Sequence, residues 1–234
     1  FTWTARQYEG PACGDCPEIS IAIPEGPEDN RLAQTVRRSL TEEIIYWLDY
    51  AEENTAKTIA EAMASFGAGY RELKERYPDE TVGWEARIEG LVRYESPSIL
   101  SISLDGYIFT GGAHGYSGRR FLNFDVEEAR ELGHEELFSD TAAFRQLAEH
   151  EFRMAWDIPA REGINSTGFM FEESRFHLPE NIGFTPEGLL LFYNPYEVAS
   201  YAEGPIELVI AYEKAAPYLS EQLMPIGAGP GPAQ

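Results

Sequence analysis

The sequence lacks a hydrophobic run long enough to cross a membrane, and it holds few basic residues. A membrane-spanning helix needs about 18 or more consecutive apolar residues, whereas the longest apolar stretches, such as residues 188–193, have the length of a strand. The 18 lysines and arginines stand against 40 aspartates and glutamates, which gives a net charge of −22. A nucleic acid or an anionic membrane surface would be repelled, because binding either one depends on cations that neutralise phosphates.

Cysteine is also scarce, with only Cys13 and Cys16 in the segment ACGDCP. Two cysteines alone do not make a zinc site. A redox CxxC motif usually opens a helix whose N-terminus lowers the thiol pKa, but here Pro17 and a strand-like segment follow. We therefore expect a small-loop disulfide or a reduced pair, and not a redox centre.

The motifs of common catalytic and phosphate-binding sites are missing as well. Neither G-x-S-x-G nor H-E-x-x-H occurs, and the glycines at 111, 112, 115 and 118 lack both the lysine of a P-loop and the spacing of a dinucleotide fingerprint. The four histidines show no HxH or HxxxH spacing, so we expect neither a metal nor a cofactor. In so acidic a chain, no carboxylate pair can be singled out as a glycosidase acid and nucleophile.

The sequence does contain enough apolar and aromatic residues for a substantial core. Hydrophobic residues make up 43% and aromatic residues 13% of the 234 residues, which suits one large domain or two small ones. Hydrophobic periodicity predicts strands at residues 18–24, 83–94, 100–109, 121–124, 182–184, 189–193 and 206–212, and helices at 30–48, 55–77, 143–156 and 213–219. Because helices cluster early and strands late, we predict an α+β fold with antiparallel sheets packed against several helices.

Two of these elements carry expectations about side-chain direction. In strand 100–109, Ser101 and Ser103 are expected on the face opposite the apolar residues. In helix 143–156, Phe152 is expected on the buried face, and Met154 is a candidate to join it.

A glycine-rich segment, TGGAHGYSGR at residues 110–119, is the most distinctive local feature. Its glycines are expected to supply positive φ angles and close backbone approach in a hairpin or bulge. We expect His114 to be structural, with a hydrogen bond to the backbone across the loop. The alternatives are a contact with a partner and a general base, which would need an orienting carboxylate and a pocket.

Tyrosines near loops indicate a binding surface. Tyr116 lies in the glycine-rich segment, and Tyr196 and Tyr201 belong to a second loop. Tyrosine is enriched at interfaces, so these three residues and His114 are the candidate partner contacts; the alternative is that the tyrosines fill the core beneath the loops. The acidity of the chain would attract a cationic protein, or it serves solubility alone.

Two long segments resemble a bacterial extracytoplasmic family. They are YIFTGGAHGYSGRRFLNFDVEEARELGHEELF at residues 107–138 and GFTPEGLLLFYNPYEVASYAEGPIELVIAY at 183–212. Both are similar to blocks of the RsiV-like family (domain of unknown function 3298), and the first half is similar to its PdaC/RsiV-like partner domain (domain of unknown function 4163). The matching motif positions are Gly111, Gly112, His114, Gly115, Asn123, Asp125, Pro195, Tyr196 and Glu197. The turn after Asp125 departs from the family, since Ala129 stands near the place where a glycine is usual.

This resemblance implies an α+β fold and a non-catalytic, protein-binding role, so no enzyme activity is expected. One relative in that family, an anti-sigma factor, binds lysozyme directly, and related domains occur beside peptidoglycan deacetylase domains and as free-standing lipoproteins. The expected function is therefore recognition or inhibition of a lysozyme-like cationic protein at the cell envelope. The alternative is an accessory module that binds peptidoglycan or another glycan.

The resemblance also sets the expected organisation and location. We predict a strand-plus-two-helix portion at residues 1–81, an RsiV-like α+β domain at 82–224 and a flexible tail at 225–234. Because the sequence starts at Phe1 and not at Met, we expect that an upstream leader or anchor was removed. The protein is expected to be extracytoplasmic, in the periplasm or at the cell surface, and to be held to the membrane only through a lipid anchor in that removed segment.

Overall fold

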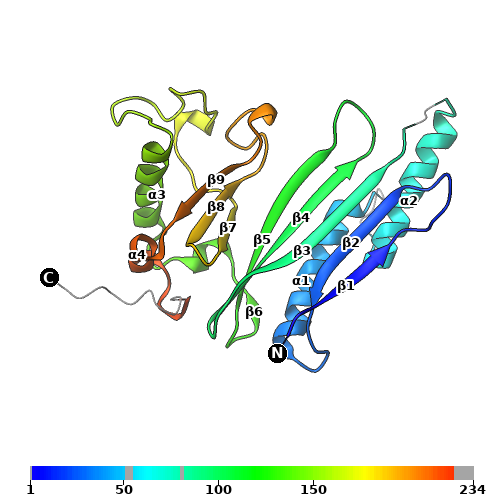
Figure 1. Cartoon of the computed structure of the whole chain (residues 1–234), viewed down its shortest axis with the longest axis horizontal. Coiled ribbons are helices and arrows are strands. Elements are labelled where there is room, and N and C mark those ends of the chain that lie inside the picture. Colours follow the sequence, from blue (N-terminus) through cyan, green and yellow to red (C-terminus); the bar gives the residue numbers. More distant parts are fainter. Residues whose placement is uncertain (1, 51–54, 80–81, 224–234) are drawn as a thin grey trace. The chain divides into compact units, whose positions relative to one another are not determined.

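A computed structural model describes residues 2–50, 55–79 and 82–223 (Figure 1). The predicted α+β class is confirmed: one sheet has the strand order β1-β2-β3-β4-β5-β6 and a second has the order β7-β8-β9. The strand pairs are mostly antiparallel, while β2 and β3 run parallel. In the part of the chain that the structure describes, no helix combines the length and hydrophobicity needed to cross a membrane.

The chain forms two compact units. The first contains Phe1–Leu91 and Leu104–Gly118, and the second contains Val92–Ser103 and Arg119–Gln234. Because residues 104–118 return to the first unit, the units do not follow the order of the chain. The predicted division into residues 1–81 and 82–224 stays a prediction, and the predicted tail at 225–234 lies outside the described residues.

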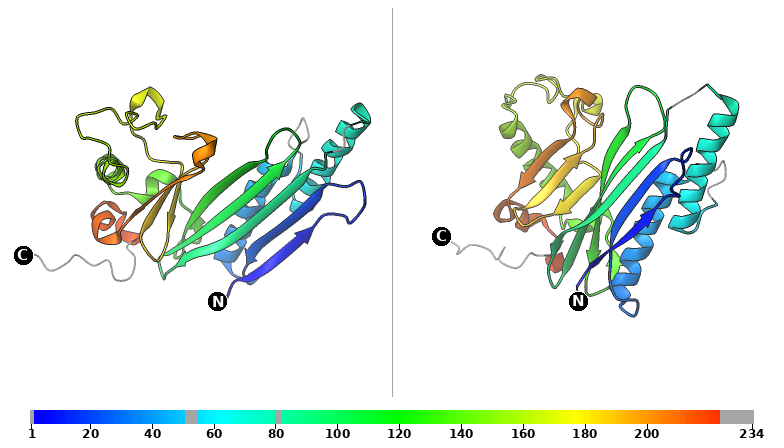
Figure 2. Two further views of the ribbon diagram at one scale, coloured as in Figure 1. Left: turned by 45° about the horizontal axis from the view of Figure 1, so that its top comes forward. Right: turned by 45° about the vertical axis from the view of Figure 1, so that its right-hand side comes forward.

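The first unit packs two helices on one face of its strands (Figures 1 and 2). Helix α1 contacts both α2 and β2. The elements that contribute to this unit are β1 (Thr4–Glu9), β2 (Glu18–Glu25), α1 (Arg31–Leu48), α2 (Ile59–Arg76), β3 (Glu85–Glu95), β4 (Ile99–Phe109) and β5 (Tyr116–Asp125). The alternating Ile19, Ile21 and Ile23 of β2 are buried, as their spacing predicts.

Side-chain caps set where the two helices begin. The Asn30 side chain accepts a hydrogen bond from the Ala33 N–H at 3.0 Å, so α1 starts where the sequence predicts. Helix α2 begins at Ile59 and not near Thr55, because Thr58 and Glu61 form a reciprocal capping box. The Thr58 hydroxyl accepts from the Glu61 N–H, while the Glu61 carboxylate accepts from the Thr58 N–H.

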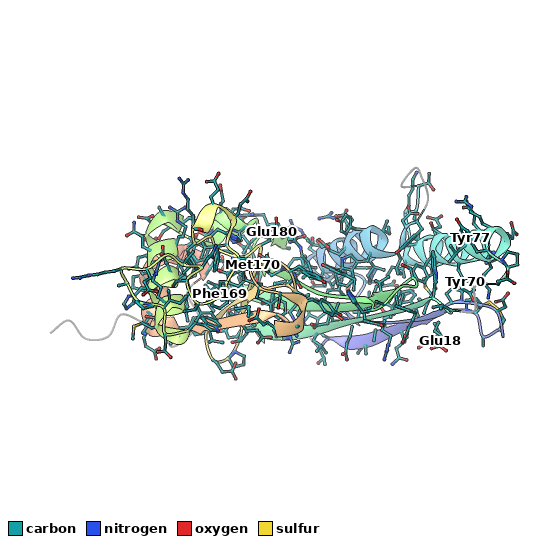
Figure 3. All side chains as sticks on the ribbon, turned by 90° about the horizontal axis from the view of Figure 1, so that it is seen from above. Glu18, Tyr70, Tyr77, Phe169, Met170 and Glu180 are labelled. Carbon is teal, nitrogen blue, oxygen red and sulfur yellow. A yellow bond between two sulfur atoms is a disulfide. The ribbon has the colours of Figure 1, made fainter. Side chains whose placement is uncertain are left out.

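An aromatic cluster anchors α2 and the disulfide loop within the first unit. The ring of Trp84 lies 5.2 Å from Phe66 and 5.9 Å from Tyr70, measured between centroids. Cys13 and Cys16 form a disulfide with a Cα–Cα distance of 5.4 Å. The Tyr70 hydroxyl donates to Asp15, inside that loop, at 3.3 Å. Figure 3 shows Tyr70 on the side of α2 that faces the strands, whereas Tyr77 lies at the end of the helix.

The second unit packs α3 (Thr141–Ala155) against β9 (Ile206–Ile210) (Figure 1). Its other elements are β6 (Arg130–Glu131), β7 (Asn181–Phe184), β8 (Leu189–Tyr193) and α4 (Tyr212–Ala215), besides parts of β3, β4 and β5. Phe144 and Phe152 of α3 are fully buried. Met154 is 66% exposed, so the suggestion that it joins this core is wrong. It lies two residues after Phe152, and a helix turns roughly 200° over two residues, away from the buried face.

Ser101 lies in a buried hydrogen-bond network, although alternation placed it opposite the apolar face. Its hydroxyl donates to Asn123 Oδ1 at 2.7 Å and accepts from the Phe184 N–H at 3.1 Å. The Asn123 amide donates to the Ile182 carbonyl at 2.7 Å, and Asn181 Oδ1 accepts from the Phe121 N–H. The serine face of β4 is therefore covered by β7, and the polar side chains there satisfy one another.

Two strands were missed in the sequence for identifiable reasons. The sequence of strand β1, TARQYE, has no apolar alternation, because almost all of its residues are exposed and none needs to be apolar. Strand β6 has only two residues, which is too short for a periodic signal. The turn between β5 and β6 is fixed in part by Asp125, whose carboxylate accepts from the Glu128 N–H at 2.8 Å.

Ala129, at the end of this turn, has a φ of 53°. The left-handed conformation destabilises a non-glycine residue by about 1 kcal/mol or more, whereas glycine adopts it without this penalty. We expect Ala129→Gly to raise the free energy of unfolding by about 0.5 kcal/mol. The gain is smaller than the strain removed, because glycine increases the conformational entropy of the unfolded chain. Urea unfolding measures this. The control is Ala142→Gly, at an exposed position in α3, which should destabilise by about 1 kcal/mol; equal losses in both variants would contradict the assignment.

Candidate functional site

The glycine-rich segment forms the connection between β4 and β5. Gly111 and Gly112 have φ angles of 103° and 89°, which confirms the expectation of positive φ. His114 is exposed, and its Nδ1 lies 3.1 Å from the carbonyl oxygen of Gly115. That partner is the adjacent residue, so this contact does not bridge the loop. Tyr116 begins β5 and is 58% exposed.

These residues border a surface pocket of ≈ 380 Å³ within the first unit. The pocket lies between the C-terminal part of α1 and the β4–β5 connection. We call it the aromatic hollow. Its lining consists of Tyr46, Trp47, Tyr50, Gly106, Ile108, Thr110, Gly111, His114, Tyr116 and Gly118. The pocket thus brings together His114 and Tyr116, which the sequence had indicated as candidate contacts, and three aromatic residues that it had not indicated.

The missed residues lie at the end of α1 and just after it. In the sequence, helical periodicity was the one signal that these aromatic side chains do not belong to the buried face. Leu48 is the fully buried member of that segment, whereas Tyr46 is 78% exposed and Tyr50 is 44% exposed. Large aromatic side chains on the polar side of an amphipathic helix are a signal for a binding surface. That these rings line one pocket is seen only in the structure, where the β4–β5 connection lies against the end of α1.

Trp47 lies directly over the backbone of β4. A Cβ atom at Gly106 would overlap the six-membered part of the Trp47 indole, so only glycine allows this approach. The indole is held between α1 and the strand, while the exposed tyrosine rings lie around it in the lining. A packed indole with exposed rings at the border suits a flat ligand.

The charges of the aromatic hollow differ from those of the chain as a whole. Among the lining residues that the structure describes, none is aspartate, glutamate, lysine or arginine, and His114 supplies an imidazole. The phenol hydroxyls, the Thr110 hydroxyl and the imidazole offer hydrogen bonds. An aromatic floor with a few polar groups at its border is typical of pockets that bind ring-shaped ligands.

A second aromatic feature lies in the second unit, where Tyr196 and Tyr201 stack. Their ring centroids are 5.3 Å apart with an interplanar angle of 28°. Tyr196 is 60% exposed and has a φ of 71°. The structure brings these two predicted contact residues together, and we call them the tyrosine pair.

Two glutamates hold the loop that carries the tyrosine pair. Glu197 Oε2 accepts from the Asn194 N–H at 2.8 Å, and Glu203 Oε2 accepts from the Ser200 N–H at 3.0 Å. The backbone N–H groups of both glutamates donate in return to Asn194 and Ser200. Burial raises the pKa of the Glu197 carboxyl above its ordinary value, and the Asn194 hydrogen bond opposes this rise. In the Pro195-Tyr196-Glu197 motif, Glu197 is therefore a structural residue.

The remaining motif residues also have structural contacts. Asn123 belongs to the buried network, and Asp125 caps the turn before β6. Among the residues that the structure describes, no group of three or more histidine, cysteine, aspartate or glutamate side chains is arranged to hold a metal ion.

The packing of Trp47 on Gly106 can be tested by mutation. We expect Gly106→Ala to destabilise the protein by about 1–3 kcal/mol, because the added methyl group must displace a packed indole. Urea unfolding followed by tryptophan fluorescence measures both the loss and the change around Trp47. The matched control is Gly83→Ala, where an added Cβ meets nothing within 4 Å. A Gly106→Ala variant as stable as the control would contradict this packing.

Two family models match different parts of the chain. Residues 13–117 match the family model described as Deacetylase PdaC, and residues 135–213 match the model described as Protein of unknown function (DUF3298). The chain therefore carries a PdaC domain followed by a DUF3298 domain. The aromatic hollow lies almost wholly within the first match, and the tyrosine pair lies within the second.

Particular relatives agree with this assignment. The chain is 21% identical over 142 residues to the peptidoglycan-N-acetylmuramic acid deacetylase PdaC of Bacillus subtilis (strain 168). That alignment covers 59% of this chain but only 30% of the relative, so the chain corresponds to less than a third of that protein.

Two solved structures share the fold. A DUF3298 family protein from Pseudomonas aeruginosa PAO1 aligns with a TM-score of 0.64 and 23% identity, covering 96% of this chain and 95% of the other. A DUF3298 family member from Bacteroides fragilis NCTC 9343 aligns with a TM-score of 0.69 and 21% identity, covering 94% and 92%. At these identities the comparison establishes the fold alone.

Proposed function

We propose that this protein binds glycan strands of the bacterial cell envelope through the aromatic hollow. The observation that carries the proposal is a pocket lined by Tyr46, Trp47, Tyr50 and Tyr116, with no lysine, arginine or carboxylate among the lining residues that the structure describes. The C–H faces of a pyranose ring pack on aromatic rings, and its hydroxyls need neutral donors and acceptors at the border. The lining offers both.

The relatives support this choice of ligand class and a location outside the cytoplasm. One of them is named as a deacetylase of peptidoglycan, which is an envelope glycan. In this proposal the chain is extracytoplasmic and acts as a binding module, and the expected lipid anchor and lack of catalytic activity remain parts of the proposal.

The exposed tyrosines allow a direct test of glycan binding. The soluble probe is a tetramer of β-1,4-linked N-acetylglucosamine, followed by calorimetry or by chemical-shift titration. We expect Tyr46→Ala and Tyr116→Ala each to weaken binding by roughly tenfold, which corresponds to about 1.4 kcal/mol for the loss of a stacking ring. Since both side chains are largely exposed, the fold should persist.

The matched control is Tyr77→Ala, because Tyr77 is 56% exposed in the same unit but does not line the aromatic hollow. This variant should bind like the wild type. The proposal fails if the probe does not bind at millimolar concentration, or if all three variants weaken binding equally.

A second candidate function, RsiV-like recognition of a lysozyme-like cationic protein, is favoured by the tyrosine pair. Two stacked rings, of which Tyr196 is exposed and Tyr201 half-buried, suit an interface with a cationic partner in a chain of net charge −22. Opposite charges alone would also produce association, but that association weakens as salt screens it.

The salt dependence of binding distinguishes specific recognition from association through opposite charges alone. A cationic lysozyme is titrated into the protein at about 50 and 300 mM salt, where the Debye length falls from about 14 to about 6 Å. Specific recognition predicts binding that persists at the higher salt and is weakened at least about tenfold by Tyr196→Ala. Met154→Ala, at an exposed position in the same unit, is the control. Binding that is lost at the higher salt concentration, or that Tyr196→Ala leaves unchanged, would contradict recognition of a lysozyme-like protein.

A further inference from the structure

We infer that the aromatic hollow selects glycan segments whose amino groups are free over segments that are N-acetylated. The inference rests on the proposed function and specifies its ligand. A free sugar amine is protonated and cationic, whereas an acetamide is neutral. The ligand class is therefore a β-1,4-linked amino sugar that carries positive charge.

The first argument is the chemistry of the lining. Four aromatic side chains, Tyr46, Trp47, Tyr50 and Tyr116, line one pocket, with no lysine or arginine among its described lining residues. The face of an aromatic ring attracts a cation, by about 0.5–1 kcal/mol at an exposed site and by more when the cation is desolvated. Proteins bind quaternary ammonium ligands in cages built from several such rings.

The second argument is the electric field around the pocket. The net charge of −22 attracts cations and repels anions. One carboxylate adjoins the lining along the chain, since Asp49 precedes Tyr50. Asp49 is itself fixed in place, because it accepts hydrogen bonds from the Ser65 hydroxyl at 2.6 Å and from the Ala56 N–H at 3.2 Å.

The third argument concerns the ligands that this field disfavours. A glycan segment carrying phosphate or free carboxylate groups would approach a strongly acidic protein and meet neither arginine nor lysine among the described lining residues. Anion recognition normally uses arginine or lysine clusters, which the lining lacks. A neutral acetamide gains nothing from the field. The cationic amino sugar is the envelope sugar that gains from both the rings and the field.

The ligand also implies the class of reaction that supplies it. Hydrolysis of the acetamide breaks its C–N bond, water provides the hydroxyl of the released acetate, and the sugar keeps the nitrogen as an amine. A binding module with this preference would recognise the product of deacetylation and not its substrate. One relative of the chain is named as a deacetylase that acts on peptidoglycan.

The test compares two tetramers of the same length and linkage, one of N-acetylglucosamine and one of glucosamine, at a pH where the sugar amines are protonated. We expect the glucosamine tetramer to bind about two- to fivefold more tightly, as one exposed cation–π contact predicts. Tyr116→Leu should reduce this preference because it removes one ring but keeps an apolar side chain. Tyr116→Phe should retain the preference, and Tyr77→Leu serves as the control.

Each outcome decides between the inference and the proposed function. A preference that survives about 300 mM salt and depends on the Tyr116 ring supports the inference. Equal binding, a preference for the N-acetylated tetramer, or a preference that salt removes and Tyr116→Leu leaves unchanged would overturn the inference. In those cases glycan binding itself still stands. If neither tetramer binds, the proposed function and the inference both fail.

Discussion

The second unit depends on a small buried hydrogen-bond network among Ser101, Asn123 and Asn181. Each of these side chains is at most 5% exposed, and their hydrogen bonds link β4 and β5 to β7 through Phe184, Ile182 and Phe121. A buried polar group without a partner costs about 1–3 kcal/mol, so such a network is stable only when every member is satisfied. That requirement specifies which strand face meets β7, because a shift of one residue would bury the wrong side chains.

A different constraint creates the aromatic hollow in the first unit. Trp47 can lie against β4 only because Gly106 has no side chain, and the positive φ angles of Gly111 and Gly112 shape the nearby turn. The glycines of the first family block therefore have a structural role, since they shape the turn. Three rings of the pocket, Tyr46, Trp47 and Tyr50, come from the end of α1 and just after it, outside those blocks, whereas His114 and Tyr116 lie inside the first block. The pocket thus combines residues from the family blocks with residues outside them.

Much of the fold could be predicted from local patterns. The isoleucine alternation of β2, the Asn30 cap of α1 and the buried phenylalanines of α3 all follow from periodicity and capping. Errors arose where local signals were absent or were overridden. The strand β1 has no apolar alternation, and the Thr58–Glu61 capping box moved the start of α2. Ser101 was expected only on the face opposite the apolar residues, and its place in a buried network was not predicted, because its partners lie 22 and 83 positions away along the chain.

The sequence by itself determined the α+β class, the strongly acidic character and most helices and strands, because periodicity, capping and charge are properties of neighbouring residues. The tertiary structure alone decided that Tyr46, Trp47 and Tyr50 share a pocket with His114 and Tyr116, and that Tyr196 stacks on Tyr201. It also decided that Met154 faces outward and that the serine face of β4 is buried. These features depend on which distant segments come together, and that information lies in the packing of the whole chain and not in any short window of it.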